Sequence, residues 1–170
     1  MKNNLYKNMP YIDVLSEPSI NMIRIYLIIR ELQVNRNNRL VLTLEKLCFF
    51  YSVIVSDDMV NTIINRSKNK DDNVFYDSED ESFSYKNSSD IKDAIEGNKI
   101  KDYIINMCSL DLITIEIIKN DKLLSINKAI TINENDPLIL KWIENIKKIK
   151  FCINKSEREL YLSLIEACHV

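Results

Sequence analysis

The chain has 170 residues, 46% of them apolar and 28% charged, and a formal net charge of −2. These values are typical of a folded globular chain and argue against a protein whose surface wraps nucleic acid, although a local basic patch stays open. Gly97 is the single glycine, so the chain cannot form a glycine-rich phosphate-binding loop. Any nucleotide hydrolysis connected with its work is therefore expected from a partner.

Signals for membranes, export and catalysis are weak. No run approaches the roughly 20 apolar residues that a bilayer span needs, and the start, MKNNLYKNMPYID, lacks the apolar core of a signal peptide. His169 is the only histidine and is penultimate, and no carboxylate pair has a distinctive spacing. We expect a cytoplasmic protein with no enzymatic activity and no cofactor.

The four cysteines lie far apart in the sequence and form no CxxC pair. They are Cys48, Cys108, Cys152 and Cys168. This spacing favours buried free thiols over a zinc site or a redox pair, so no metal is expected.

The first predicted helix follows a polar arm at residues 1–15. The segment SEPSINMIRIYLIIRELQ, from Ser16 to Gln33, has proline in its first turn and apolar residues around most of its circumference. Its solvent face is marked by Asn21, Arg24 and Glu31. Such a helix is either central to the fold or presents a free apolar face to another chain. Under the second interpretation, Ile28 is a candidate partner-binding residue.

Residues 39–66 combine a short strand with two capped helices. Leu40 to Leu42 form the strand, Thr43 is the expected N-cap of an apolar helix, and Ser56 caps the next helix. The composition then changes, because residues 67–90 contain seven acids against three lysines. We expect a solvated loop there; an acidic DNA mimic or a metal-binding loop is the alternative.

A helix over Asn98–Ser109 and a β-hairpin follow, and whether the helical pattern that starts near residue 90 forms one helix or two is open. Residues 113–126 alternate in polarity, with Asn120 and Asp121 as the expected turn. Four lysines on the helix and near the hairpin tip are candidate DNA contacts: Lys99, Lys101, Lys119 and Lys122. Acids are interspersed with these lysines, so a solvated face is the alternative.

Two helices end the chain. Asp136 caps the first, and Ser156 with Glu159 forms a capping box for the second. The last helix has more apolar residues than one buried stripe needs, which makes three of them candidate partner contacts. They are Tyr161, Leu162 and Ile165.

The order of elements predicts a mainly α fold with a small β-hairpin, containing a winged-helix-like core and C-terminal helices. In domain terms we expect an arm at 1–15, a winged-helix-like domain at 16–132 with an acidic loop at 67–90, and a helical pair at 133–170. The helix over residues 98–109 would hold the recognition position, with the hairpin as the wing. Winged helices bind either DNA or proteins, so the fold leaves both functions open.

Two segments resemble a known family. EPSINMIRIYLIIREL followed by RLVLTLEKLCFFYSVIV is similar to the opening of the middle components of bacterial ABC-three-component systems, which include the small subunit of Lamassu-type anti-phage defence. IEGNKIKDYIINMCSLDLITIEI resembles a second block, a helix that ends in leucine, glycine, leucine and isoleucine. Here Asp111 stands in place of that glycine. The resemblance covers about residues 10–130.

The resemblance implies a non-catalytic subunit that bridges an SMC- or Rad50-like ABC ATPase and an effector, often a nuclease, in a complex that responds to foreign DNA. It implies no catalytic residues, no small-molecule substrate and no membrane, and it leaves DNA contact through the complex open. The alternative is a winged-helix transcriptional regulator that binds DNA by itself. A structural homodimer is a third possibility.

Overall fold

The computed structural model of the chain describes residues 17–68 and 98–168. The described elements are α1 (Pro18–Leu32), α2 (Leu44–Val53), α3 (Asp57–Lys68), α5 (Asn98–Ser109), β1 (Ile113–Ile118), β2 (Asp121–Ile126), α6 (Pro137–Ile149), the 3-10 turn η4 (Lys150–Asn154) and α7 (Glu157–Cys168). This confirms the predicted mainly α fold with a small β-hairpin. The expected arm at 1–15 lies outside the described residues, as does the acidic loop except Ser67 and Lys68, which continue α3.

The helix starts follow the capping signals in the sequence. The Thr43 hydroxyl accepts a hydrogen bond from the backbone N–H of Lys46 at the start of α2. The Asp136 carboxylate accepts from two N–H groups in the first turn of α6, and Ser156 and Glu159 bond each other's backbone N–H at α7. These bonds satisfy donors that have no partner inside a helix, so they determine where each helix begins.

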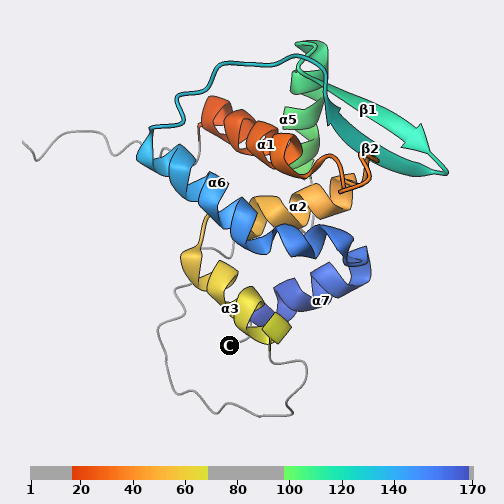
Figure 1. Cartoon of the computed structure of the whole chain (residues 1–170). Helices are drawn as coiled ribbons and strands as arrows, with labels where there is room; N and C mark the ends of the chain where they lie inside the picture. Colours follow the sequence, from red (N-terminus) through yellow and green to blue (C-terminus); the bar gives the residue numbers. More distant parts are fainter. Residues whose placement is uncertain (1–16, 69–97, 169–170) are drawn as a thin grey trace, which may run out of the picture.

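Helix α1 is the centre of the fold. It packs against α2, α5, α6 and β2, as Figure 1 shows, and is therefore covered on most sides. The predicted solvent face is wrong for Asn21 and Arg24, which are both buried. The Arg24 guanidinium carbon lies 3.4 Å from the Tyr51 ring centroid, and the Tyr51 hydroxyl donates to the Asn21 side chain at 2.7 Å. Stacking on an aromatic face and polar contacts allow these groups to lie inside the core.

Ile28 is also buried, with 0% of its surface exposed. The proposal that it contacts a partner is therefore wrong, because its side chain already packs in the core. One continuous apolar cluster contains residues from α1 through α7. The C-terminal helices predicted as a separate pair at 133–170 thus share this core with the rest of the described chain.

The hairpin pairs Ile113 with Ile126 and Ile118 with Asp121 in antiparallel register. Lys119 and Asn120 form the turn, with φ of 52° and 74°. Two consecutive positive φ values are typical of a two-residue type I′ turn. The turn therefore lies one residue before the expected Asn120 and Asp121, because Asp121 already belongs to β2.

The segment before α2 contacts β2 but is not a regular strand. The Leu42 carbonyl accepts from the Leu124 N–H at 2.9 Å, and Thr43 forms an isolated bridge with Leu123. Leu40 instead forms a bridge with Val34 at the end of α1. The segment before α2 therefore meets the hairpin only at Leu42 and Thr43.

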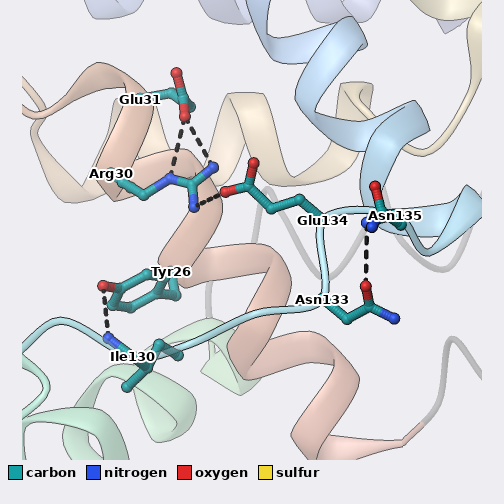
Figure 2. Close-up of polar contacts among 7 residues, drawn as sticks. All are labelled: Tyr26, Arg30, Glu31, Ile130, Asn133, Glu134 and Asn135. Carbon is teal, nitrogen blue, oxygen red and sulfur yellow. Dashed lines mark hydrogen bonds and ion pairs between the residues drawn. The ribbon is translucent and has the colours of Figure 1, made fainter.

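The segment of residues 127–136 runs along α1 and connects the hairpin to α6. Figure 2 shows the Tyr26 hydroxyl accepting a hydrogen bond from the Ile130 N–H, and Arg30 lying between Glu31 and Glu134. The distance between Arg30 Nη1 and Glu134 Oε1 is 2.7 Å. These contacts fix the path of the segment and, with it, the position of the hairpin relative to α1.

The hydrophobic lengths of the described helices are modest. None of them alone is long and apolar enough to cross a bilayer, and α2 with α3 reaches that length only as a pair bent by 115°.

Candidate protein-binding surface

The outer face of α5 is set by its buried face. Ile100, Ile104 and Met107 are buried, and their helical spacing turns them toward α1 and β1. Ile105 follows directly after a buried position and is 61% exposed. Leu110, just beyond the helix, is 59% exposed. Helix α5 and the residue that follows it therefore expose two large apolar side chains to solvent.

The end of α5 is a Schellman motif that fixes Leu110 and the start of β1. The Leu112 N–H donates to the Met107 carbonyl and the Asp111 N–H to the Cys108 carbonyl, both at 3.0 Å. Asp111 has φ of 60°, the left-handed conformation usually taken by glycine at this position. The Asn127 amide donates to its carboxylate at 2.6 Å. Asp111 therefore takes a conformation that glycine usually supplies at a helix end, and its side chain is held by Asn127.

The four candidate DNA-contacting lysines are exposed and lie on separate elements. Lys99 and Lys101 lie in the first turn of α5, whereas Lys119 lies in the hairpin turn and Lys122 in β2. Residues 98–126 contain four lysines and four acids, so this part of the chain has no net charge to attract a duplex.

The hairpin carries an apolar row on one face of β1. Ile113 is buried, Ile115 is 42% exposed and Ile117 is 71% exposed. Figure 1 shows the hairpin projecting from the helical body, which explains why exposure increases toward its tip. Residues two apart in a strand share a face, so the buried row at the base continues as an exposed row.

A groove of about 840 Å³ lies on the other face of the hairpin, between it, the start of α2 and the start of α7. Lys46 donates from Nζ to the Ile153 carbonyl at 2.8 Å, and Glu157 accepts from the Thr43 hydroxyl at 2.7 Å. Burial lowers the pKa of Lys46, although Glu157 and Asp121 partly oppose that effect. These two bonds hold η4 and the start of α7 against the start of α2.

Helix α7 exposes part of its apolar surface. Leu160, Leu164 and Ala167 are buried on the side that packs on α2 and α3. The candidate partner contacts Leu162 and Ile165 are 48% and 45% exposed, while Tyr161 is half-buried. Burial also raises the Tyr161 pKa. The structure thus leaves Leu162 and Ile165 accessible, three residues apart on one side of the helix.

The exposure of the apolar residues Ile105, Ile115 and Ile117 was not predicted from the sequence. Ile105 lies beside Ile104 in a helix with a clear buried face, and the strand isoleucines alternate as core residues do. Only their position relative to α1 shows that Ile105, Ile115 and Ile117 lack cover. The sequence signal for an exposed apolar face is a larger number of apolar residues than one buried stripe needs. This signal is clear only in α1 and α7.

Neither thiols nor metal ligands form a chemical site in the described ranges. Cys48 and Cys152 are buried free cysteines, and burial raises the pKa of each to about 11. Within residues 17–68 and 98–168, no group of three His, Cys, Asp or Glu side chains could hold a metal ion.

No family model, curated protein or solved structure matches this chain. Function is therefore inferred from the surface of the molecule and from the resemblance in its sequence.

Proposed function

We propose that this chain is a non-catalytic adaptor subunit of a bacterial anti-phage or anti-plasmid defence complex. It links an SMC- or Rad50-like ABC ATPase to an effector, and the effector is a nuclease in this proposal. The observation that carries the proposal is the exposure of two large apolar side chains, Ile105 in α5 and Leu110 directly after it.

The order of contacts supports a winged-helix interpretation in which α5 holds the recognition position. Helix α1, the bridge at Thr43, α2, α3, α5 and the hairpin come in this order along the described chain, and α5 packs against α1 and β1. A DNA-reading helix presents hydrogen-bonding and cationic side chains to bases and phosphates. Apolar side chains in the same place gain free energy only when a protein surface covers them, at about 1.5–3 kcal/mol for a fully buried side chain.

A second apolar surface supports the adaptor role. Leu162 and Ile165 lie on α7, which packs on α2 and α3, whereas α5 packs on α1 and β1. An adaptor needs two such surfaces, one for each partner. We propose that one of the two surfaces binds the ATPase and the other binds the effector.

Co-purification tests this assignment. The tagged chain is expressed with the ABC ATPase and the effector encoded beside its gene, and Ile105→Asp is compared with Ile165→Asp. Each variant is expected to release one partner and keep the other, and the partner that Ile105→Asp releases is the one that Ile165→Asp keeps. Both positions are exposed, so circular dichroism should show an unchanged fold.

The alternative is a DNA-binding regulator, favoured by the exposed Lys119 and Lys122 at the hairpin tip. The paired change Lys119→Glu with Lys122→Glu distinguishes the two functions. Salt-dependent binding of the isolated chain to duplex DNA, abolished by this change, with no ATPase recovered, would refute the adaptor proposal. Recovery of the ATPase at wild-type levels with both lysines reversed supports it.

A further inference from the structure

We infer that the outer edge of β1 pairs with the same edge of a second copy of this chain, joining two hairpins into one four-stranded antiparallel sheet. This inference is independent of the proposed adaptor function. It rests on the direction of the backbone groups of β1 and on the pattern of its side chains.

The hydrogen bonds of β2 determine which groups of β1 point outward. The N–H groups of Leu124 and Ile126 donate away from β1, to the Leu42 carbonyl and the Gln33 side chain. Leu124 is opposite Ile115 and Ile126 is opposite Ile113. Residues that face each other in an antiparallel pair orient their backbone groups alike, toward or away from each other. The N–H and C=O groups of Ile113, Ile115 and, by alternation, Ile117 therefore point to the outer edge.

The two edges of the hairpin are treated differently. The edge of β2 is covered by Gln33 and by residues 42–43, whereas no described residue pairs with the edge of β1. Native sheets usually protect a free edge with lysine, proline or a bulge. The sequence of β1, ITIEII, has no lysine or proline, and its six residues pair with β2 in unbroken register. This edge is open to an added strand.

The side chains of β1 favour its own copy as that strand. Two copies related by a two-fold axis at Ile115 place Ile113 opposite Ile117 of the second copy, so all three outward-facing residues of each chain form hydrogen-bonded pairs. Thr114 then faces Glu116 of the second copy, and no carboxylate faces another. If the two-fold axis lay at Glu116, the Glu116 carboxylates of the two copies would face each other. Only Ile115 and Ile117 of each strand would then form hydrogen-bonded pairs. The register centred on Ile115 is therefore preferred.

The same register covers the exposed row of isoleucines. Ile115 packs beside Ile115 of the second copy, and the highly exposed Ile117 lies beside the second Ile113. A strand-edge contact is smaller than the roughly 1,200 Å² of a standard interface, so we expect a dissociation constant on the order of 1–100 μM. The second copy thus buries apolar surface that the hairpin leaves in solvent.

Sedimentation velocity over a range of concentrations measures the association. The wild-type chain is expected to shift from monomer to dimer, and Ile115→Pro to remain a monomer. Proline removes an N–H that β2 does not use, so the hairpin is retained. Ile117→Lys is a second disruptive variant that leaves the backbone intact. Leu140→Lys is the control, because this exposed residue lies on α6 and not on the edge of β1.

Oxidative cross-linking tests the register. Ile115→Cys places two thiols at the two-fold axis, with Cα atoms about 5.5 Å apart, within reach of a disulfide. Ile117→Cys places its two copies roughly 13 Å apart along the strands, beyond that reach. We expect Ile115→Cys to form covalent dimers and Ile117→Cys to behave as the wild-type chain, which controls for the native cysteines.

Three results would overturn the inference. One is a wild-type chain that stays monomeric at concentrations on the order of 0.1 mM. Another is equal cross-linking of Ile115→Cys and Ile117→Cys. The third is a dimer that survives both Ile115→Pro and Ile117→Lys, because another surface would then hold the two chains.

Discussion

Replacing Ile28 by alanine separates the core role of this residue from the partner-binding role that the sequence suggested. Its side chain is fully buried in α1. Ile165→Ala is the matched control, because it makes the same chemical change at a helix position that is 45% exposed. Both changes gain the same small helix preference for alanine, so that effect cancels in the comparison.

The expected cost at Ile28 follows from its burial. The substitution removes three carbons, each worth about 0.8 kcal/mol when buried, and leaves a cavity that α2, α5 and α6 can only partly close. Together these effects predict a loss of about 3 kcal/mol in the free energy of unfolding. The half-exposed Ile165 is expected to lose less than about 1 kcal/mol. In a chain of this size the difference corresponds to a Tm lower by roughly 5–10 °C.

Urea unfolding provides the measurement. Trp142 is the only tryptophan and is fully buried, so its fluorescence reports on the core, while circular dichroism reports on the helices. The urea midpoint should fall in Ile28→Ala with an unchanged m-value. Equal losses of unfolding free energy in Ile28→Ala and Ile165→Ala would refute the packing argument, because Ile28 would then behave as an exposed residue.

Three further predictions concern charge, thiols and helix capping. Hydrogen bonds from Asn145 and from Lys141 hold the pKa of Asp57 below its ordinary value of 3.8. A depressed pKa stabilises the fold above the ordinary value, and this contribution disappears as pH falls through the lowered value. Asp57→Asn should therefore lower Tm at pH 7 by a small amount, and the difference from the wild-type chain should shrink below pH 3.8 in thermal melts. Cys48 and Cys152, with pKa raised to about 11, should resist iodoacetamide at pH 8 in the folded chain and react in urea, as peptide mass spectrometry can show. Rapid labelling of the folded chain would contradict their burial. Asp136→Ala removes the acceptor for two N–H groups of α6 and should cost about 1 kcal/mol in urea unfolding, whereas Asp136→Ser should restore most of it.

Local structure was predictable because its signals lie within a few residues of one another. The caps at Thr43, Asp136 and Ser156 need only a hydroxyl or carboxylate beside the first N–H groups of a helix. The hairpin needs only alternation and a turn, and the one-residue error at Asn120 arose because both turn placements contain residues that tolerate positive φ. Such signals depend on short-range geometry.

Burial was less predictable because it depends on what packs around an element. Arg24 looks like a solvent residue by type, yet the Tyr51 ring, a distant part of the chain, covers its guanidinium. Ile28 looks like excess apolar surface, but α1 has neighbours on most sides. Conversely, Ile105 looks like core and lies in solvent.

The sequence by itself determined the helices, their caps, the hairpin and the absence of a glycine-rich phosphate loop, because propensity and short-range hydrogen bonding decide these features. Only the tertiary structure decided which apolar faces are covered, because covering requires contacts between distant segments. It placed α1 at the centre and left α5, α7 and β1 with exposed apolar residues. The free edge of β1 was likewise decided in three dimensions, since Gln33 and Leu42 occupy the β2 edge from outside the hairpin.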